Sequence, residues 1–254
     1  MDFERIIELV KNSGRMVKNL AHDEYNTRLK GQSDFVTASD IAVSKYLKKE
    51  LKSEAPHVGF LSEEEGGRLT DPCWILDPVD GTANLVYGLN MSSVSLGLYV
   101  GGRVVFGVVY NPFSGECFTA EEGKGAFLNN SRIAVSKRDI SQSIVEFGAG
   151  STHKENADIS FAVAKDIFMH CVDIRRICSS ALDLCFIASG RIDGYFEFVL
   201  KPWDVAAGSL ILSEAGGRIT DMNGRAIDLS RKTSVVASNG VIHDYLLNTI
   251  SQNM

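Results

Sequence analysis

The hydrophobic pattern of this chain changes near Ser136, and the change limits the folds that the chain can adopt. Before it, helix-like stretches at 2–21 and 39–52 precede a series of strand-like runs, which predicts helices packed on an antiparallel sheet. After it, strand-like and helix-like runs alternate, which is typical of a layered α/β arrangement. Because no Pro- or Ser-rich linker separates the halves, we expect two closely packed lobes, at 1–136 and 137–254.

The same patterns predict the individual elements. We expect a hairpin across 93–110 that turns at Gly101 and Gly102. The expected strands lie at 57–61, 74–76, 116–120, 143–147, 172–174, 192–198, 218–220 and 234–237. The expected later helices lie at 154–169, 180–189 and 203–215, with one more at the C-terminus.

Charge and composition narrow the class of protein. The formal net charge is −6 and no polybasic run occurs, which argues against nucleic acid or an anionic membrane as the main partner. The N-terminus interleaves charged and apolar residues and lacks the apolar centre of a signal peptide, so we expect a cytoplasmic protein. Five cysteines without paired spacing predict buried, reduced thiols.

The segment WILDPVDGTANL at 74–85 carries the most chemical information. An apolar strand runs directly into Asp77, Asp80 and Thr82, and it is expected to end in a turn that opens a helix. Pro78 fixes its own φ, and Gly81 lets the backbone approach a ligand closely. The pattern therefore presents two carboxylates and a hydroxyl at one end of a strand.

Further acidic residues stand at the ends of other predicted elements: Asp34, Asp40, Glu63, Glu64, Glu65 and Asp204. Each alone could be a helix cap or part of a solvated loop. Together in one cleft they would repel one another unless cations neutralised them, and an all-oxygen donor set suits Mg²⁺ or Mn²⁺. The five histidines are dispersed and show no zinc-like spacing.

Three motifs in this order, GFLSEEEGG, WILDPVDGTANL and KPWDVAAGSLILSEAGG, resemble the metal-site motifs of the inositol monophosphatase family. DFVTASD and the region FGVVYNPFSGECFTAEEGKGAFLN resemble further parts of that family, so the resemblance covers nearly the whole chain. It implies the sugar phosphatase fold, an α+β protein layered as an α-β-α-β-α sandwich. It also implies hydrolysis of a small sugar or cyclitol phosphate, with inositol 1-phosphate as the leading substrate.

Matching motif positions also carries the family's site residues to this chain. The resemblance implies two or three Mg²⁺ ions, with Mn²⁺ possible, held by Glu63, Asp77, the carbonyl of Val79, Asp80 and Asp204. Thr82, supported by Asp40, and Glu64 would position the attacking water. The implied substrate-binding residues are Lys30, Glu63, Val79, Asp80, Gly81, Thr82, Arg175, Ser180, Glu197 and Asp204. A homodimer and sensitivity to lithium are further properties that the resemblance implies.

One position departs from the family pattern, because Cys178 stands where the family usually has glycine. We expect Cys178 to pack at the start of the following helix, although a side chain there could also reshape the substrate pocket. Fructose 1,6-bisphosphate and NADP⁺ therefore remain alternative substrates. DGTANL differs from the DGTKEF of the relatives that act on 3′-phosphoadenosine 5′-phosphate.

Two other classes of function stay open from the sequence. An aspartyl-nucleophile phosphatase would resemble DxDx(T/V), whereas Asp77 and Asp80 are three residues apart with a proline between them. The other is a noncatalytic regulatory protein that keeps the fold and contacts transcription machinery. The complete set of acidic positions argues against the loss of catalysis.

Overall fold

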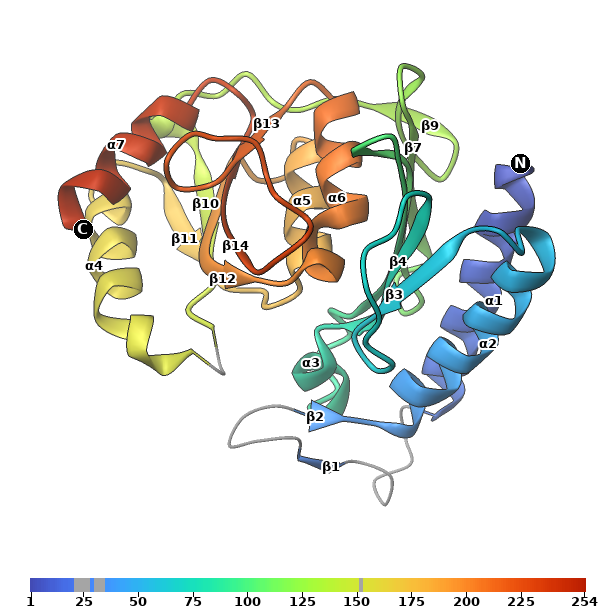
Figure 1. Cartoon of the computed structure of the whole chain (residues 1–254). Helices are drawn as coiled ribbons and strands as arrows, with labels where there is room; N and C mark the ends of the chain where they lie inside the picture. The colour runs from blue at the N-terminus through green and yellow to red at the C-terminus, as the bar shows by residue number, and fades with distance from the viewer. Residues whose placement is uncertain (21–27, 30–34, 151–152) are drawn as a thin grey trace.

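The computed structural model describes residues 1–20, 28–29, 35–150 and 153–254 of the chain (Figure 1). The helices are α1 (Phe3–Leu20), α2 (Ala38–Glu54), α3 (Thr82–Val86), α4 (Ala157–Phe168), α5 (Ser180–Ala188), α6 (Pro202–Glu214) and α7 (His243–Asn253), with 3₁₀ turns η2 (Ile140–Gln142) and η3 (Lys154–Asn156). The first strands are β1 (Arg28–Leu29), β2 (Phe35–Val36), β3 (Gly59–Ser62), β4 (Cys73–Asp80), β5 (Ser93–Val100), β6 (Arg103–Asn111), β7 (Glu116–Glu121), β8 (Gly125–Leu128) and β9 (Ser131–Ile133). The later strands are β10 (Ile144–Phe147), β11 (Asp173–Arg175), β12 (Gly194–Leu200), β13 (Arg218–Thr220) and β14 (Thr233–Ser238).

Two large sheets organise the described part of the chain. The first has seven strands in the order β3-β4-β5-β6-β7-β8-β9, and only its β3–β4 pair is parallel. The second has five strands in the order β11-β10-β12-β14-β13, with β10 parallel to both of its neighbours. The expected hairpin at 93–110 is confirmed, since β5 and β6 pair antiparallel across the turn at Gly101 and Gly102.

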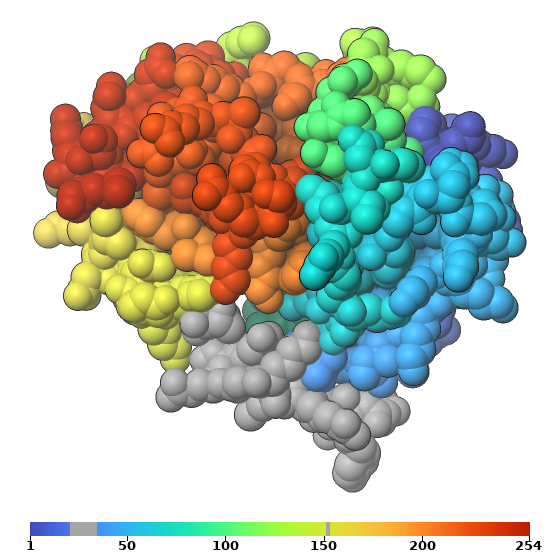
Figure 2. All heavy atoms as spheres, in the orientation of Figure 1, coloured from blue at the N-terminus to red at the C-terminus, as the bar shows by residue number. Residues whose placement is uncertain are grey.

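The helices complete five layers, as Figure 1 shows. Helices α1 and α2 cover the outer face of the first sheet, α5 and α6 lie between the sheets, and α4 and α7 cover the outer face of the second. This is the α-β-α-β-α sandwich that the resemblance implied. In the space-filling view of Figure 2, the N-terminal helices and the C-terminal segment lie on opposite sides of the molecule.

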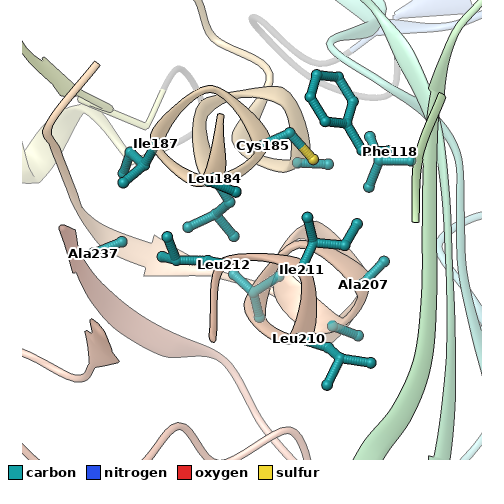
Figure 3. Close-up of a cluster of buried hydrophobic side chains, with 14 of the residues drawn as sticks. Phe118, Leu184, Cys185, Ile187, Ala207, Leu210, Ile211, Leu212 and Ala237 are labelled. Atoms are coloured by element: carbon teal, nitrogen blue, oxygen red, sulfur yellow. The ribbon is translucent and has the colours of Figure 1, made fainter. Parts of the chain in front are cut away.

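The central layer is the most deeply buried part of the protein (Figure 3). Every residue of α5 is buried, because this helix has one sheet on each side and α6 beside it. Helix α6 approaches the first sheet closely at Gly107, where an added Cβ would lie 2.8 Å from the carbonyl oxygen of Ala207. Small residues in the VAAG segment therefore let α6 pack directly on the strands that precede the lobe connection.

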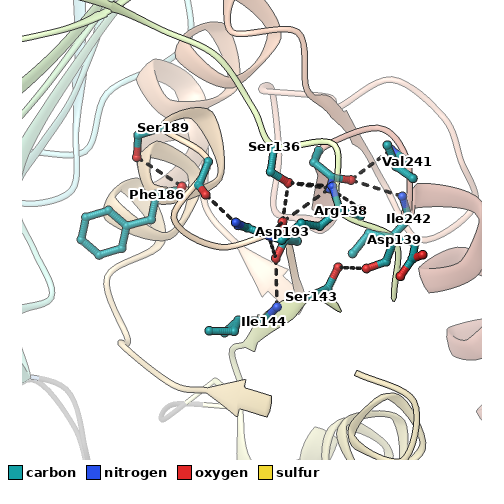
Figure 4. Close-up of polar contacts among 12 residues, drawn as sticks. Ser136, Arg138, Asp139, Ser143, Ile144, Phe186, Ser189, Asp193, Val241 and Ile242 are labelled. Atoms are coloured by element: carbon teal, nitrogen blue, oxygen red, sulfur yellow. Dashed lines mark hydrogen bonds and ion pairs between the residues drawn. The ribbon is translucent and has the colours of Figure 1, made fainter. Parts of the chain in front are cut away.

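The connection between the sheets, after Ile133 and before Ile144, is fixed by a buried carboxylate (Figure 4). Asp193 is fully buried and accepts hydrogen bonds from Ser136 Oγ at 2.5 Å, Arg138 Nε at 2.9 Å and the Ile144 N–H at 2.9 Å. Asn239 Nδ2 adds a longer contact of 3.5 Å. The division into lobes at 1–136 and 137–254 stays a prediction, but this network holds its connection in one conformation.

Two expectations about local structure are wrong. The strand expected at 74–76 continues to Asp80, because a β-bulge accommodates Pro78 inside β4. Not all cysteines are buried: the five thiols are free, but Cys171 is half-buried and Cys178 is exposed. Within the described ranges, the helices are too short or too polar to cross a membrane.

Candidate active site

The bulge in β4 brings the two aspartates of the DPVDGT segment to one cleft. Asp77 pairs across the sheet with Ser95 and Asp80 pairs with Ser93, so three steps along β4 match two along β5. Without the extra residue, side chains three positions apart would point to opposite faces of the strand. Both aspartates instead line the same cleft, whose volume is about 430 Å³.

Gly81 makes the turn from β4 into α3 possible. Its φ is +80°, and an added Cβ would lie 2.8 Å from the carbonyl oxygen of Met91. Any other residue would be strained there and would also collide with the backbone. The turn places Thr82 at the first position of α3, with its side chain on the cleft wall.

Asp80 joins the two halves of the site. Its Oδ2 accepts hydrogen bonds from Ser179 Oγ and from the Ala181 N–H at 3.0 Å, both at the start of α5. Ser93 Oγ on β5 lies 3.5 Å from the same oxygen. Asp80 is therefore held by β5 of the first sheet and by the start of α5. Sequence analysis did not predict this role for Ser179 or Ala181.

Asp204 and Glu63 also line the cleft, and Lys201 contacts both of them. The Lys201 N–H donates to Asp204 Oδ2 at 2.7 Å, which fixes the carboxylate at the start of α6. Glu63 follows β3, and the Lys201 ammonium lies 3.7 Å from its Oε1. Lys201 is thus a further residue of the cleft, and it is the first residue of the KPWD segment that contains the predicted ligand Asp204.

The acidic groups of the cleft perturb one another strongly. Burial raises the pKa of Asp77 well above its ordinary value, and the charges of Glu63, Asp80 and Asp204 raise it further. Burial likewise raises the pKa of Asp204, and that of Asp80 to about 6 against the opposing hydrogen bond from Ser179. A buried acidic group of this kind is stabilised in its ionised form by a bound cation.

Thr82 and Asp40 form the hydrogen-bonded pair that the family resemblance implies. Thr82 Oγ1 lies 2.9 Å from the carbonyl oxygen of Val79 and 3.3 Å from Asp40 Oδ1. The other oxygen of Asp40 accepts the N–H and the hydroxyl of Thr37, at 2.8 and 2.6 Å, so that Asp40 also closes the capping box of α2. Burial raises the pKa of Asp40 to about 7.

Glu197 is a further carboxylate that lines the cleft. Its Oε2 accepts the Tyr195 hydroxyl at 2.5 Å, and its Oε1 accepts the Gly150 N–H at 3.1 Å. Ser180 Oγ lies 3.1 Å from the same Tyr195 hydroxyl, and both Ser180 and Glu197 line the cleft. An added Cβ at Gly148 would lie 2.0 Å from Glu197 Oε2, so any side chain there would force this carboxylate out of its present position.

The arginine of the cleft is Arg176, one residue beyond the predicted Arg175. Arg175 ends β11, is exposed, and pairs with Asp173 outside the cleft. Arg176 lines the cleft, with its guanidinium over the rings of Phe147 at 5.4 Å and Phe161 at 6.0 Å. Neighbouring residues of an extended segment point to opposite sides, so Arg175 is not among the described residues that line the cleft, and its substrate-binding role stays a prediction.

Three other predicted positions have different outcomes. Cys178 lines the cleft, is exposed and has a φ of +63°, so the expectation that it packs at a helix start is wrong. Glu64 follows Glu63 but is not among the residues found to line the cleft in the described part of the chain. Lys30 lies outside the described residues.

The donor set of the cleft fits Mg²⁺. The candidate ligands are oxygens, from four carboxylates and the backbone at Val79, all from residues that line the cleft. Across the described ranges, no three His, Cys, Asp or Glu side chains are arranged to hold a metal by themselves. Mg²⁺ commonly takes only one or two carboxylates and completes its shell with water and substrate phosphate, so spaced carboxylates suit it.

The fold and the cleft together define a class: a five-layered α-β-α-β-α protein with an oxygen-rich acidic cleft suited to cation-assisted chemistry on an anion. The family model described as the Inositol monophosphatase family matches residues 3–254, and the chain belongs to that family. Membership makes the chain a phosphatase of phosphomonoesters, in a family whose members generally depend on a metal.

Curated relatives and solved structures agree with this assignment. A Nus factor SuhB of Pasteurella multocida is 39% identical over 88% of this chain and 85% of its own length. Inositol monophosphatase 1 of Homo sapiens is 34% identical over 96% of this chain and 92% of its own. The crystal structure of an extragenic suppressor protein suhB from Bartonella henselae superposes with a TM-score of 0.92 at 33% identity, covering 99% of both chains.

Proposed function

We propose that this chain hydrolyses a small phosphomonoester in a Mg²⁺-dependent reaction, with inositol 1-phosphate as the leading substrate. The observation that carries the proposal is the shared cleft of Asp77, Asp80, Asp204 and Glu63, beside the Thr82–Asp40 pair. When bound, Mg²⁺ would screen the phosphate and lower the pKa of an attacking water.

The chain's own residues position that water. The Thr82 hydroxyl has a single proton, and when Asp40 Oδ1 accepts it, the lone pairs of Thr82 Oγ1 are free to accept from water. Asp40 is itself held by Thr37, so the pair is fixed before substrate arrives. We propose that Glu64 helps Thr82 to position this water, and that the N–H groups of Gly81 and Thr82 bind phosphate oxygens.

Glu197 and Arg176 are proposed to orient the alcohol part of the substrate. Glu197 is fixed by Tyr195 and Gly150, so it can accept a hydrogen bond from a substrate hydroxyl without reorganising. Ser180, which shares the Tyr195 hydroxyl, is proposed to contact the same part of the substrate. This arrangement suits a polyol such as myo-inositol.

A second candidate substrate class uses the same catalytic groups. Arg176 has no carboxylate partner among the described residues, and the rings of Phe147 and Phe161 hold its guanidinium at the cleft. A guanidinium in this position suits a second anionic group. Fructose 1,6-bisphosphate and NADP⁺ carry such groups.

A regulatory role is a separate proposal, supported by the relatives named Nus factor SuhB. It does not exclude catalysis, because a phosphatase cleft occupies only part of the surface. An Asp80→Asn variant would separate the roles, since it should lose hydrolysis and keep a partner-binding surface outside the cleft. A cytoplasmic homodimer inhibited by lithium remains a further proposal, to be tested by light scattering and by inhibition assays.

The decisive assay is phosphate release with Mg²⁺ and with EDTA, across inositol 1-phosphate, fructose 1,6-bisphosphate, NADP⁺ and 3′-phosphoadenosine 5′-phosphate. We expect release that requires Mg²⁺ and is fastest with inositol 1-phosphate. Release that persists in EDTA, or a trapped phosphoaspartate, would contradict water attack assisted by Mg²⁺. No release from folded protein would favour the regulatory role.

A further inference from the structure

Lys201 brings a fixed positive charge into the acidic cleft. Its ammonium lies 3.7 Å from Glu63 Oε1 and 5.3 Å from the centre of the Trp203 ring. Its backbone N–H donates to Asp204 Oδ2, so the residue is tied to one carboxylate by its main chain and to another by its side chain. Glu63 follows β3 and Lys201 precedes α6, so this ion pair bridges segments distant in sequence.

An ammonium and a divalent cation compete for Glu63. Mg²⁺ binds carboxylate oxygens at roughly 2.1 Å and requires a nearly regular octahedron around it. An ammonium beside the same carboxylate occupies part of that shell and repels the incoming charge. We therefore expect a cation that binds Glu63 Oε1 to displace the Lys201 ammonium.

Two contacts other than Glu63 would hold Lys201 after its ammonium is displaced. The Lys201 backbone is held by Asp204, and the ammonium already lies 5.3 Å from the centre of the Trp203 ring, so both contacts remain available to the residue after it leaves Glu63. The other charged partner that enters this cleft is the phosphate of the proposed substrate. An ammonium is a suitable point charge for a phosphate oxygen.

We propose that Lys201 is a positioning residue that couples cation and anion binding: it weakens the Glu63 cation site when no anion is bound and pairs with the anion when the cation takes Glu63. This inference rests on the proposed function, because it requires Mg²⁺ and phosphate to share the cleft. By linkage, phosphate must then tighten Mg²⁺ binding, and Mg²⁺ must tighten phosphate binding by the same factor.

If the Lys201–Glu63 ion pair served only to link the two segments, the effects of its removal would be different. Its removal would lower the free energy of unfolding and would leave Mg²⁺ affinity unchanged or reduce it. Partly exposed ion pairs are worth about 0.2–1 kcal/mol, which corresponds to a change of up to about fivefold in an equilibrium constant. If the Lys201 ammonium instead competes with Mg²⁺ for Glu63, its removal should increase the affinity for Mg²⁺ by a factor of this size.

Calorimetric titration of the purified protein with Mg²⁺, with and without inorganic phosphate, tests the inference. The variants are Lys201→Met, Lys201→Arg and the control Lys124→Met, which removes a lysine paired with Glu121 away from the cleft. Without phosphate, we expect Lys201→Met to bind Mg²⁺ about two- to fivefold more tightly than the wild type, and Lys124→Met to match the wild type. Phosphate should tighten Mg²⁺ binding in the wild type and in Lys201→Arg, and less in Lys201→Met.

A second readout follows the side chain directly. In a Trp74→Phe background, where Trp203 is the remaining tryptophan, Mg²⁺ should change the fluorescence of the Lys201 protein and have less effect on the Lys201→Met protein. Equal or weaker Mg²⁺ binding by Lys201→Met, or unchanged coupling to phosphate, would overturn the inference while leaving the phosphatase proposal intact. Failure of the wild type to bind Mg²⁺ would overturn both.

Discussion

Removal of the Asp193 carboxylate should destabilise the protein more than any change to a surface acid. Asp193 is fully buried and pairs with Arg138, which is partly exposed. Asp193→Ala would leave the Arg138 guanidinium, the Ser136 hydroxyl and the Ile144 N–H without this acceptor. Because Arg138 is partly exposed, the main cost comes from the donors left without an acceptor, about 1–3 kcal/mol for each one that stays buried.

Asp193→Asn should cost less, about 1–3 kcal/mol, because the amide keeps one acceptor oxygen and the shape of the side chain. The control is Asp139→Ala, which removes an exposed carboxylate bonded to Ser141 in the same connection and should change stability by less than about 0.5 kcal/mol. Urea unfolding followed by circular dichroism gives the three free energies, with an unchanged denaturant slope as evidence of an unchanged fold. A loss below about 1 kcal/mol for Asp193→Ala would refute the argument that this network fixes the lobe connection.

Three further outcomes test the site and its surroundings. Thr82→Ala should lower kcat by about 10²–10⁴-fold and Thr82→Ser far less, as measured by steady-state phosphate release, because only the hydroxyl can hold the water. Arg176→Met should raise KM for the preferred substrate about tenfold, whereas the neighbouring Arg175→Met should leave KM unchanged. Equal effects of the two variants on KM would contradict the substrate-binding role proposed for Arg176. Glu146 is buried, and burial raises its pKa from 4.5 to about 7, so the folded state keeps a proton that the unfolded state loses within this window. The contribution of Glu146 to stability should therefore fall by on the order of 2–3 kcal/mol between about pH 4.5 and 7, and Glu146→Gln should remove this part of the pH dependence in urea unfolding at a series of pH values, while the parts that come from the raised pKa values of Asp40 and Asp80 remain.

The local sequence predicted the elements that depend on local pattern. The hairpin of β5 and β6 follows from two apolar strands around Gly101 and Gly102, and it forms as expected. The strand at 74–76 was predicted too short, because Pro78 normally interrupts a ladder and nothing local signals a bulge. The bulge depends on the register with Ser93 and Ser95, which only the folded sheet defines.

Side chains that hold the site from a distance were not predictable in the same way. Ser179 and Ala181 bind Asp80 across about a hundred positions of sequence, and neither belongs to a motif that signals this contact. The local sequence does not distinguish Arg175 from Arg176, because in a doublet of arginines the direction of each side chain depends on where the short strand β11 ends. Lys201 could have been found from the KPWD segment itself, which places a basic residue three positions before the proposed metal ligand Asp204.

Features of the fold that were not predicted from the sequence bring the acidic residues of the cleft together. The bulge sets Asp77 and Asp80 on one wall, and the start of α5 fixes Asp80 against the first sheet. The close packing of α6 on β6, which Gly107 permits, brings Asp204 to the same wall. The catalytic proposal therefore depends on the contact between the two halves, and neither half contains the complete acidic set.

The most direct test of the central claim compares the wild type with Asp77→Asn and with the exposed control Asp158→Asn. Mg²⁺-dependent phosphate release from inositol 1-phosphate and urea unfolding should be measured on the same preparations. Because a bound cation contributes several kcal/mol of transition-state stabilisation, we predict that kcat for Asp77→Asn falls by about 10³-fold or more. Its stability in EDTA should equal or exceed that of the wild type, since the change relieves repulsion among buried carboxylates. Wild-type activity in a folded Asp77→Asn protein would contradict the account.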